Sequence, residues 1–364
     1  MLKSLHMTQT LAPLPIPGNI QLETPEVLRQ LARAHRRLAE LKGAAKTIPN
    51  EAILIDTLSL KEAKDSSAIE NIITTEDELF QEDPESESFA SPAAKEVHNY
   101  AAALKVGFVR VRQQGFIRLH DILMVHETLE QNRAGLRKLP GTKLKNDQTG
   151  EVVYEPPQDP AEIQRLMENL VAYLNRDEIG DPDVLIRMAI LHFQFESIHP
   201  FYDGNGRTGR ILNLLHLVLH GLLDHPVLYL SRYIVRHKAE YYRGLQAVRD
   251  NASWEAWVLY MLRAVEETSK ETLERIGEIR ALMMETKHRI RTRLPKIYSR
   301  ELLNNLFQHP YTKIDFVEKD LGVSRPTATK YLEELVKAQI LRKTKSGRTN
   351  FYVNQPLFDL LGRQ

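Results

Sequence analysis

The chain has 364 residues, of which 42% are hydrophobic and 27% are charged, as is usual for a soluble globular protein. Lysine and arginine together number 49 against 48 acidic residues, so no global charge draws the chain to nucleic acid or to a membrane. The absence of cysteine excludes disulfides and thiolate metal sites. Neither a signal peptide nor a run of apolar residues long enough to span a bilayer is visible, so we expect a cytoplasmic chain of two or three domains.

The first third of the chain is predicted to be helical after an irregular lead-in that contains several prolines. Apolar residues recur at helical spacing in five segments, 24–41, 52–63, 66–71, 92–114 and 117–131. The acidic segment 81–88 interrupts them and is predicted to be a solvated loop.

Residues 135–157 differ from the helical segments around them. Glycine, proline and an asparagine-aspartate pair, all common in turns, lie between two short runs, Lys143–Lys145 and Val152–Tyr154. This pattern predicts a β-hairpin in an otherwise helical chain.

Helical spacing resumes after the hairpin. Further helices are predicted over 160–175, from Asp181 and Pro182 to residue 198, over 211–223, and over 237–250, 253–268 and 270–293. The segment 211–223 is apolar nearly all round, and a helix without a polar face is buried, so we expect it to be the central helix of a bundle.

From Ser299 onward the pattern changes to three helical segments followed by two short strands around a Ser-Gly turn. Three helices and a hairpin in this order are typical of a winged helix-turn-helix domain. We place its boundary near Pro295.

The segment His199–Arg210, with the sequence HPFYDGNGRTGR, interrupts the helical pattern between strongly apolar flanks. An asparagine between two glycines lets backbone N–H groups converge on one point. The helix that follows adds its unpaired N–H groups and the positive end of its dipole. Together these features indicate an anion site of phosphate size.

The polar side chains of this segment suit a nucleotide. Arg207 and Arg210 lie three residues apart, so both can reach phosphate oxygens. Asp203 favours a cation such as Mg²⁺ between its carboxylate and the phosphates, and His199 is near enough in sequence to accept a proton there. Each residue alone could be a turn, a cap or a structural histidine, but their conjunction indicates phosphoryl or nucleotidyl transfer. No GxxxxGK[ST] motif is present to support a P-loop ATPase.

The segment matches the signature of Fic-domain proteins, HxFx(D/E)GNGRxxR, at every fixed position, and residues 90–265 resemble their helical core. The resemblance implies a protein adenylyltransferase, which transfers AMP from ATP to a Tyr, Thr or Ser hydroxyl of a protein, itself included. It implies that His199 is the catalytic base and that Phe201 packs under the loop. It also implies a set of residues that bind ATP and its phosphates: Asp203, which would hold Mg²⁺, and Gly204, Asn205, Gly206, Arg207, Thr208, Gly209 and Arg210.

Two further segments resemble parts of the same family. The hairpin falls where relatives have a flap that pairs with the target by strand addition, and its first run contributes Lys143, Leu144, Lys145 and Asn146. Tyr241 and Tyr242 resemble a pair that borders the nucleoside, although a tyrosine pair on an amphipathic helix is core about as often.

Other aromatic residues have structural interpretations. His216 and His220 lie four residues apart, which would suit a metal pair, but their helix is apolar and no third ligand is evident, so we favour packing. Trp254 and Trp257 are expected to pack their helix onto the bundle.

The sequence SSAIEN resembles the inhibitory motif (S/T)xxxE(G/N) of the family, with Ser66, Glu70 and Asn71 at its fixed positions. The resemblance implies an inhibitory helix on the same chain, whose Glu70 presents a carboxylate to Arg210 and so displaces the γ-phosphate contact. The alternative is that Glu70 is a solvated helix residue.

Residues 322–353 contain seven lysines and arginines against two acids, which would suit a duplex backbone, yet winged helices also dock proteins or dimerise. We therefore keep DNA, a partner protein and a homodimer open for this domain.

The sequence predicts a mainly α fold in four parts: residues 1–89 with the inhibitory helix 66–71, a Fic core over 90–265 with a β-hairpin flap, a linking helix over 266–295, and a winged helix-turn-helix domain over 296–364. Alternatives to AMP transfer stay open, including a related transfer of another group by the same site. The chain could be a DNA-binding regulator whose Fic core senses nucleotide, or the same site could remove AMP. The intact His199 favours an enzyme over a sensor.

Overall fold

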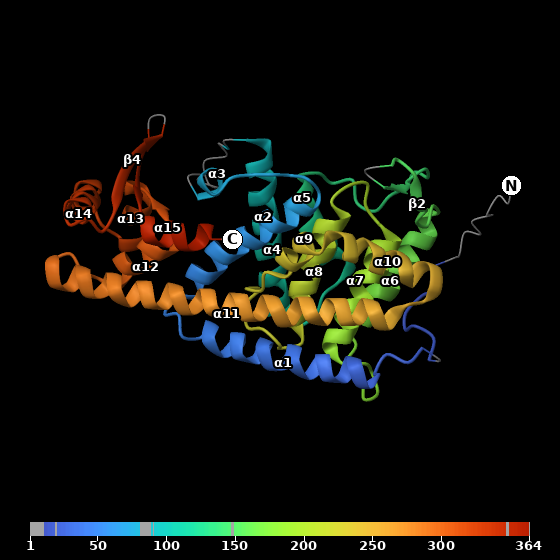
Figure 1. Ribbon diagram of the computed structural model, residues 1–364. Coiled ribbons are helices and arrows are strands. Elements are labelled where there is room, and N and C mark those ends of the chain that lie inside the picture. The colour runs from blue at the N-terminus through green and yellow to red at the C-terminus, as the bar shows by residue number, and fades with distance from the viewer. Residues whose placement is uncertain are drawn as a thin grey trace. The chain divides into compact units, whose positions relative to one another are not determined.

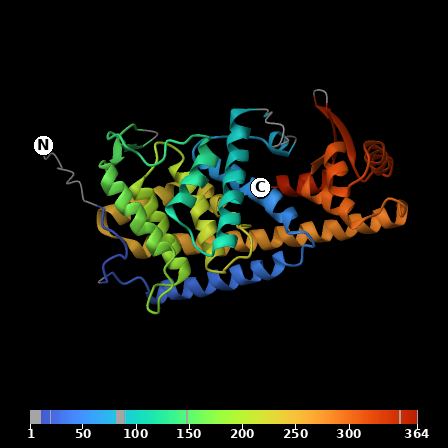
Figure 2. The ribbon, with the colours of Figure 1, turned by 180° about the vertical axis from the view of Figure 1, so that it is seen from behind.

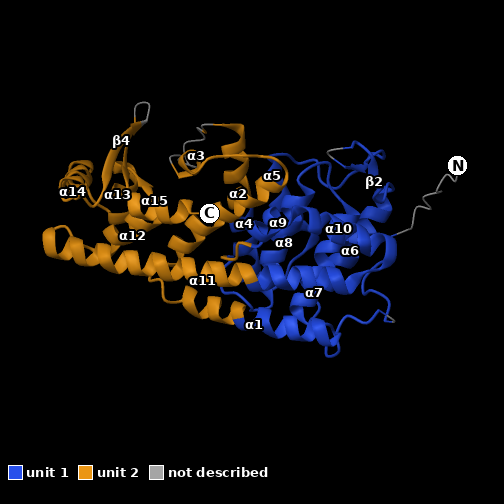
Figure 3. Ribbon diagram, viewed as in Figure 1, with its two compact units in different colours: residues 1–36, 102–226, 230–266 blue, residues 37–101, 227–229, 267–364 orange. Residues whose placement is uncertain are grey.

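A computed structural model describes residues 11–18, 20–80, 89, 91–146, 149–346 and 349–363, and they form a mainly helical fold (Figure 1). The acidic segment 81–88 and most of the proline-containing lead-in lie outside the described residues, as do Gly347 and Arg348. The chain forms two compact units, which are coloured separately in Figure 3: residues 1–36, 102–226 and 230–266 make unit 1, and residues 37–101, 227–229 and 267–364 make unit 2.

Unit 1 is a helical bundle. It contains α5 (Leu119–Glu130), α6 (Pro160–Leu174), α7 (Val184–Ile198), α8 (Asn205–Leu219), α9 (Leu230–Arg236) and α10 (Lys238–Asn251), and parts of α1 (Pro25–Ala45), α4 (Pro92–Gln114) and α11 (Trp254–Arg293). Helices α6, α7 and α8 pack side by side, as the ribbon shows from both directions (Figures 1 and 2). Nearly every residue of α8 up to Leu217 is buried, as predicted for the helix over 211–223, but the helix begins earlier, at Asn205, and ends at Leu219.

The start of α7 differs from the prediction. Its N-cap is Asp183 rather than Asp181, because the Asp183 carboxylate accepts the N–H of Leu185 at 2.8 Å. The same carboxylate lies 2.9 Å from Nε2 of His35 on α1. The start of α6 follows the prediction, with Asp159 as N-cap and Pro160 in the first turn.

Two pairs of predicted helices are single helices. Residues 51–69 form one helix, α2 (Glu51–Ile69), because no glycine or proline separates 52–63 from 66–71, and Ser66 and Ser67 are buried within it. Residues 254–293 likewise form one helix, α11. There the hydroxyl of Thr272 donates to the carbonyl of Thr268 at 2.7 Å, so these polar residues bond to their own helix instead of ending it.

The predicted hairpin is present in unit 1. Strands β1 (Leu144–Lys145) and β2 (Val152–Tyr154) pair antiparallel, with Leu144 opposite Tyr154 and Lys145 opposite Val152. The N–H of Asn146 donates to the carbonyl of Glu151 at 2.8 Å and extends the pairing by one residue.

The C-terminal part of unit 2 confirms the winged-helix arrangement. Three helices, α12 (Arg300–Gln308), α13 (Ile314–Leu321) and α14 (Arg325–Lys337), precede strands β4 (Arg342–Ser346) and β5 (Thr349–Val353). Strand β3 (Tyr311–Thr312) completes an antiparallel sheet of order β3-β5-β4. The sequence did not predict four elements: β3, the closing helix α15 (Gln355–Gly362), and the short helices α3 (Glu76–Phe80) and α9.

Within unit 2, the α2–α3 segment contacts the C-terminal elements. Helix α12 packs against α2, and Gln308 donates to the carboxylate of Asp56 at 2.7 Å. Tyr311 of β3 donates to the carboxylate of Asp77 on α3, and the rings of Phe80 and Phe358 meet edge to face. The winged helix therefore shares a core with residues far upstream in the sequence.

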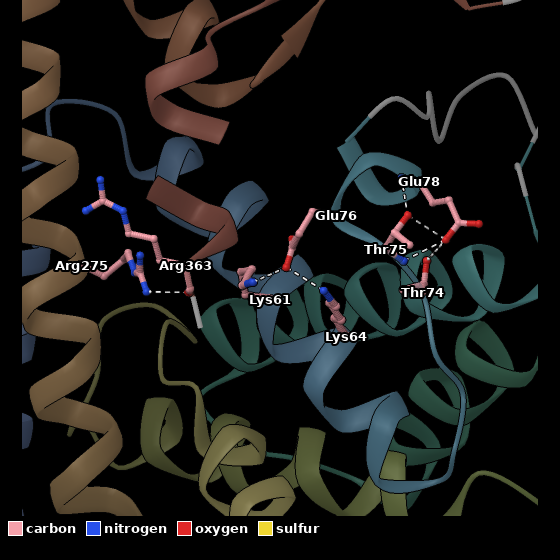
Figure 4. Close-up of polar contacts among 8 residues, drawn as sticks. All are labelled: Lys61, Lys64, Thr74, Thr75, Glu76, Glu78, Arg275 and Arg363. Carbon is pink, nitrogen blue, oxygen red and sulfur yellow. Dashed lines mark hydrogen bonds and ion pairs between the residues drawn. The ribbon is translucent and has the colours of Figure 1, made fainter. Parts of the chain in front are cut away.

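A polar cluster ties α3 back to α2 (Figure 4). Glu76 accepts from Lys61 at 2.5 Å and from Lys64 at 2.7 Å. Burial lowers the pKa of the Lys61 ammonium, while the two lysines lower the pKa of Glu76 despite its own burial. In the same view Glu78 accepts from the backbone and side chain of Thr75 and from the hydroxyl of Thr74.

Candidate active site

The signature segment forms the turn between α7 and α8. Helix α7 ends at Ile198, and His199 follows as its C-cap in the left-handed region, with φ 48° and its N–H donating to the carbonyl of Phe195 at 2.9 Å. Pro200 cannot continue the helix. His199 therefore stands at a fixed reversal of the chain, immediately before the loop that leads into α8.

The side chain of Asn205 holds this loop closed. Its Oδ1 accepts the N–H of Phe201 at 2.8 Å, and its Nδ2 donates to the carbonyl of Phe201 at 2.9 Å. Asn205 is 3% exposed. Its amide is thus used within the loop, so its predicted contribution to phosphate binding would come from its backbone N–H at the start of α8.

Gly204 is required both by backbone conformation and by space. Its φ of 68° lies in the left-handed region, and a Cβ built there would be 2.2 Å from Oε1 of Glu130. The Glu130 carboxylate thus lies directly against the loop backbone.

Glu130 also pairs with the first signature arginine. Nη2 of Arg207 lies 3.0 Å from the Glu130 carboxylate and 3.9 Å from that of Asp203, and its side chain is 4% exposed. Arg210 is buried as well, at 2% exposed. Both arginines predicted to hold phosphates are therefore buried, in the first turns of α8.

Asp203 is the exposed acid of the loop. Its side chain is 81% exposed, and its Oδ1 accepts the N–H of Gly204 at 2.7 Å. Its carbonyl accepts from Nε2 of His126 at 3.0 Å, and the His126 ring stacks on Phe201 at 3.7 Å between centroids. Burial lowers the pKa of His126, which keeps that ring neutral. Phe201 is fully buried beneath the loop, as expected.

His199 has the protonation state of a base. Burial and, to a smaller extent, the nearby cations Arg137 and Arg249 together lower the pKa of its imidazole to about 4. The ring is therefore neutral at physiological pH and able to accept a proton.

The flap residues are accessible. Lys143, Lys145 and Asn146 are exposed and Leu144 is half-buried, and Lys143 lies 3.7 Å from the carboxylate of Glu155. Val152 and Val153 on β2 are 44% and 43% exposed. Such an exposed hairpin edge is available for pairing with another strand.

The predicted tyrosine pair is divided between core and surface. Tyr241 is 2% exposed and its hydroxyl lies 2.8 Å from Nε2 of the buried His192, inside an aromatic cluster with Trp257. Tyr242 is 49% exposed. Only Tyr242 presents a ring that a nucleoside could contact from outside the core.

The other aromatic predictions are confirmed as packing. Nε2 of His216 and of His220 lie 3.1 Å and 3.0 Å from the carbonyls of Val184 and Leu174. Trp257 is fully buried and donates to the carbonyl of Ala189 at 2.8 Å, while Trp254 packs on Phe193. Among the described residues no group of three or more His, Cys, Asp or Glu is placed to hold a metal ion.

Sequence reasoning missed several residues that build this site: His126, Glu130, Arg137, Tyr154, Tyr202 and Arg249. The hydroxyl of Tyr154 on β2 donates to the carbonyl of Ser197 at 3.0 Å, and the guanidinium of Arg249 lies 4.1 Å from the Tyr154 ring centroid. Most of these side chains meet backbone atoms or neighbours distant in sequence, so no spacing rule indicates them.

The segment predicted to be inhibitory, residues 66–71, lies in unit 2, at the end of α2. Ser66 is fully buried, Glu70 is the C-cap of the helix, and Asn71 adopts the left-handed region with φ 64°. The motif thus ends a long helix rather than forming a short one of its own.

The α7–loop–α8 arrangement and the signature residues around it define a protein of the Fic class. Successive parts of the sequence match the Fic/DOC family N-terminal region (residues 28–109), the Fic/DOC family itself (110–217) and the SoFic-like C-terminal domain of protein adenylyltransferases (282–357). The chain belongs to the Fic/DOC family.

Relatives and solved structures agree with this membership. Protein adenylyltransferase fic-1 of Caenorhabditis elegans is 30% identical over 128 residues, which cover 35% of this chain and 24% of that protein. The probable protein adenylyltransferase aq_aa38 of Aquifex aeolicus is 32% identical over 127 residues, covering 35% and 36%. The chain thus matches only about a quarter to a third of the length of these curated relatives.

A crystal structure of a Fic family protein from Desulfovibrio desulfuricans covers 94% of this chain and 98% of its own, with a TM-score of 0.59 and 20% identity. At this identity the likeness is one of fold. None of the helices in the described part of the chain is long and apolar enough to cross a membrane.

Proposed function

We propose that the chain is a protein adenylyltransferase that transfers AMP from ATP to a Tyr, Thr or Ser hydroxyl of a protein, itself included. The observation that carries this proposal is the state and place of His199. It is a neutral, half-buried imidazole fixed at a chain reversal beside the N-terminal turns of α8. Relatives that share this part of the sequence are named protein adenylyltransferases.

In the proposed reaction His199 removes the proton from the acceptor hydroxyl. The oxygen attacks the α-phosphorus of ATP and forms a phosphodiester, while the bond from that phosphorus to the β-bridging oxygen breaks and pyrophosphate leaves. The N-terminal N–H groups and dipole of α8, together with Arg207 and Arg210, stabilise the charge on the phosphates. Catalysis then depends on positioning more than on covalent chemistry.

The exposed carboxylate of Asp203 fits a magnesium ion that arrives with the nucleotide. Mg²⁺ is commonly bound by one or two carboxylates together with substrate phosphates, and Asp203 offers one carboxylate at the mouth of the loop. When bound, the ion would neutralise phosphate charge.

Labelled ATP tests the proposal. The full-length protein is incubated with Mg²⁺ and either α- or γ-labelled ATP, and protein-bound label is measured. Retention from the α-position alone supports AMP transfer. Label retained from the γ-position would mean phosphate transfer, and loss of preformed AMP-protein without new labelling would favour AMP removal by the same site.

We further propose that Glu70 restrains this activity, on the strength of the Ser66–Asn71 motif. Glu70→Gly should raise self-modification by about tenfold or more, because the Glu70 carboxylate would no longer compete with an ATP phosphate for a charge-assisted contact. Equal rates for Glu70→Gly and the wild type would remove the inhibitory role.

The structure of the winged helix supports DNA binding less strongly than the count of basic residues in the sequence does. Arg325 lies within 3.2 Å of the carboxylates of both Asp315 and Glu318, and Lys343 lies 2.6 Å from Glu333, so two of the counted cations are already paired. A mobility shift that weakens steeply with salt would favour the DNA-binding regulator, and its absence would favour a protein partner or homodimer.

A further inference from the structure

One buried side chain, Arg137, contacts both the catalytic turn and the chain beyond the flap. It lies between α5 and β1 and is 1% exposed. Its Nε donates to the carbonyl of His199 at 2.7 Å, and its Nη2 donates to the carbonyl of Pro157 at 2.9 Å and more weakly to that of Ile198 at 3.4 Å. Its backbone N–H donates to the carbonyl of Pro200 at 2.8 Å.

These contacts provide hydrogen-bond donors for the carbonyls at the C-terminal end of α7. The last carbonyls of a helix have no partner within it, and leaving them buried without one is costly. Arg137 supplies donors to three consecutive carbonyls, those of residues 198–200. Its charge also complements the negative end of the helix dipole. The guanidinium thus caps the helix at the very turn that carries His199.

A second contact fixes the chain next to Arg137. The hydroxyl of Tyr202, in the catalytic loop, accepts the backbone N–H groups of Lys138 at 3.0 Å and Leu139 at 3.1 Å. Residues 137–139 lead into the flap, so the flap entrance is bonded to the loop at both Arg137 and Tyr202.

The far end of the flap is attached to the same place. Arg137 bonds the carbonyl of Pro157, just beyond β2, and Tyr154 on β2 bonds the carbonyl of Ser197 in the last turn of α7. Both ends of the hairpin are therefore joined to residues 197–202, and the side chain of Arg137 contacts both the segment beyond β2 and the turn that carries His199.

We infer that Arg137 is a positioning residue whose guanidinium holds His199 and the flap in one fixed geometry, through its three bonds to the carbonyls of residues 157, 198 and 199. The inference rests on the proposed function for its catalytic consequence, since the flap would align the acceptor and His199 would take its proton. Lysine cannot replace arginine here. An ammonium is a point charge, whereas the planar guanidinium presents several donors in fixed directions.

The test compares Arg137→Lys with Arg133→Lys in the full-length protein. Arg133 is a matched control because its side chain is 86% exposed and it pairs with Glu127, whose side chain is 42% exposed. Three quantities are measured: the maximal rate of self-modification with Mg²⁺ and α-labelled ATP, the ATP concentration at half-maximal rate, and amide exchange of peptides over residues 139–157. Thermal unfolding establishes that each variant is folded.

For Arg137→Lys we expect the maximal rate to fall by about ten- to a hundredfold, with the half-saturating ATP concentration changed less than about twofold. We also expect faster exchange of the flap amides, and no change in Arg133→Lys. Should Arg137→Lys fail to fold, Tyr202→Phe loses only the hydroxyl of a half-exposed ring and should show the same pattern more weakly.

The inference would be overturned if Arg137→Lys had the same maximal rate of self-modification and the same amide exchange in the flap as the wild type. So would a parallel loss of rate and ATP affinity, because that pattern indicates a general structural defect. If wild type and Arg133→Lys both fail to label any acceptor, the proposed function fails instead. The exchange comparison then still decides whether Arg137 fixes the flap.

Discussion

The polar residues of the catalytic loop divide into those that build the loop and those that face solvent. Asn205 is buried and bonds the backbone of Phe201, while Glu130 at the end of α5 is half-buried against the loop and pairs with Arg207. Asp203 is exposed at the surface of the same loop. A loop whose bonds are already made can present its N–H groups and its base without rearrangement, which is what electrostatic preorganisation requires.

At the residue scale, Gly204→Ala should damage the loop more than its backbone conformation alone explains. The φ of 68° is unfavourable for alanine by about 1–2 kcal/mol, and the added Cβ would also meet the Glu130 carboxylate at 2.2 Å. Gly115→Ala is the matched control, since φ there is 72° and nothing lies within 4 Å of the added atom. We expect denaturant titration to show the larger loss of unfolding free energy for Gly204→Ala. Equal losses of unfolding free energy in the two variants would mean that the loop or the Glu130 side chain moves to accommodate the added methyl group at little cost.

The residues of the signature could be predicted because each has a chemical reason to stand near phosphate, and their spacing is fixed within twelve positions of the chain. Arg137 and Glu130 could not be predicted. Arg137 bonds backbone carbonyls, and Glu130 pairs with Arg207, which only folding brings near it. Tyr241 shows the reverse limit. Its sequence context suits a nucleoside contact, yet burial beside His192 assigns its ring to the core.

At the scale of elements, helical periodicity predicted most helices of the bundle, and turn residues predicted the flap and the wing. The errors have local causes. Serine and threonine near residues 66 and 268 resemble helix ends, but in α2 and α11 they are buried or bond to the helix itself, so both helices continue. Strand β3 has two residues and α3 has five, which is too short for a period to be detected.

The polar cluster between α2 and α3 gives a test at this scale. Glu76 pairs with Lys61, whose side chain is 8% exposed, so Glu76→Gln leaves a buried ammonium without its counter-charge. We expect a loss of about 3 kcal/mol of unfolding free energy in denaturant titrations. Adding Lys61→Met should recover most of it, because the uncompensated charge is then gone.

Glu162→Gln is the control for that experiment, because it breaks an exposed pair with Arg165 and should change stability little. If Glu76→Gln were as mild as Glu162→Gln, the Lys61–Glu76 pair would not stabilise the α2–α3 segment.

At the scale of the whole molecule, the compact units do not follow the order of the chain. Residues 37–101, 227–229 and 267–364 form one unit, in which α2 packs on α12 and α3 contacts β3 and α15. Sequence composition indicated a terminal domain that begins near Pro295, because helix and strand patterns are local. It could not indicate that this domain shares buried surface with α2, since no pattern within one segment records its distant partner.

Removal of residues 296–364 tests this sharing. The deletion removes α12 from α2, together with the hydrogen bond from Gln308 to the carboxylate of Asp56. We expect the remaining protein to unfold at least about 5 °C lower in calorimetry, with faster amide exchange in α2. An unchanged transition and unchanged exchange would mean that the terminal domain is thermodynamically independent.

The central claim is that the loop around His199 transfers AMP to protein. The most direct measurement is peptide mass spectrometry of the full-length protein after incubation with Mg²⁺ and ATP, for wild type, Glu70→Gly and Glu70→Gly/His199→Ala, with ATP binding measured in parallel by calorimetry. We expect AMP on a hydroxyl side chain of the first two proteins, in larger amount in Glu70→Gly. The double variant should still bind ATP but lose transfer by about a hundredfold or more, because a general base contributes far more to rate than to affinity. AMP found in equal amount on the double variant, or on none of the three proteins with any acceptor protein supplied, would contradict the account.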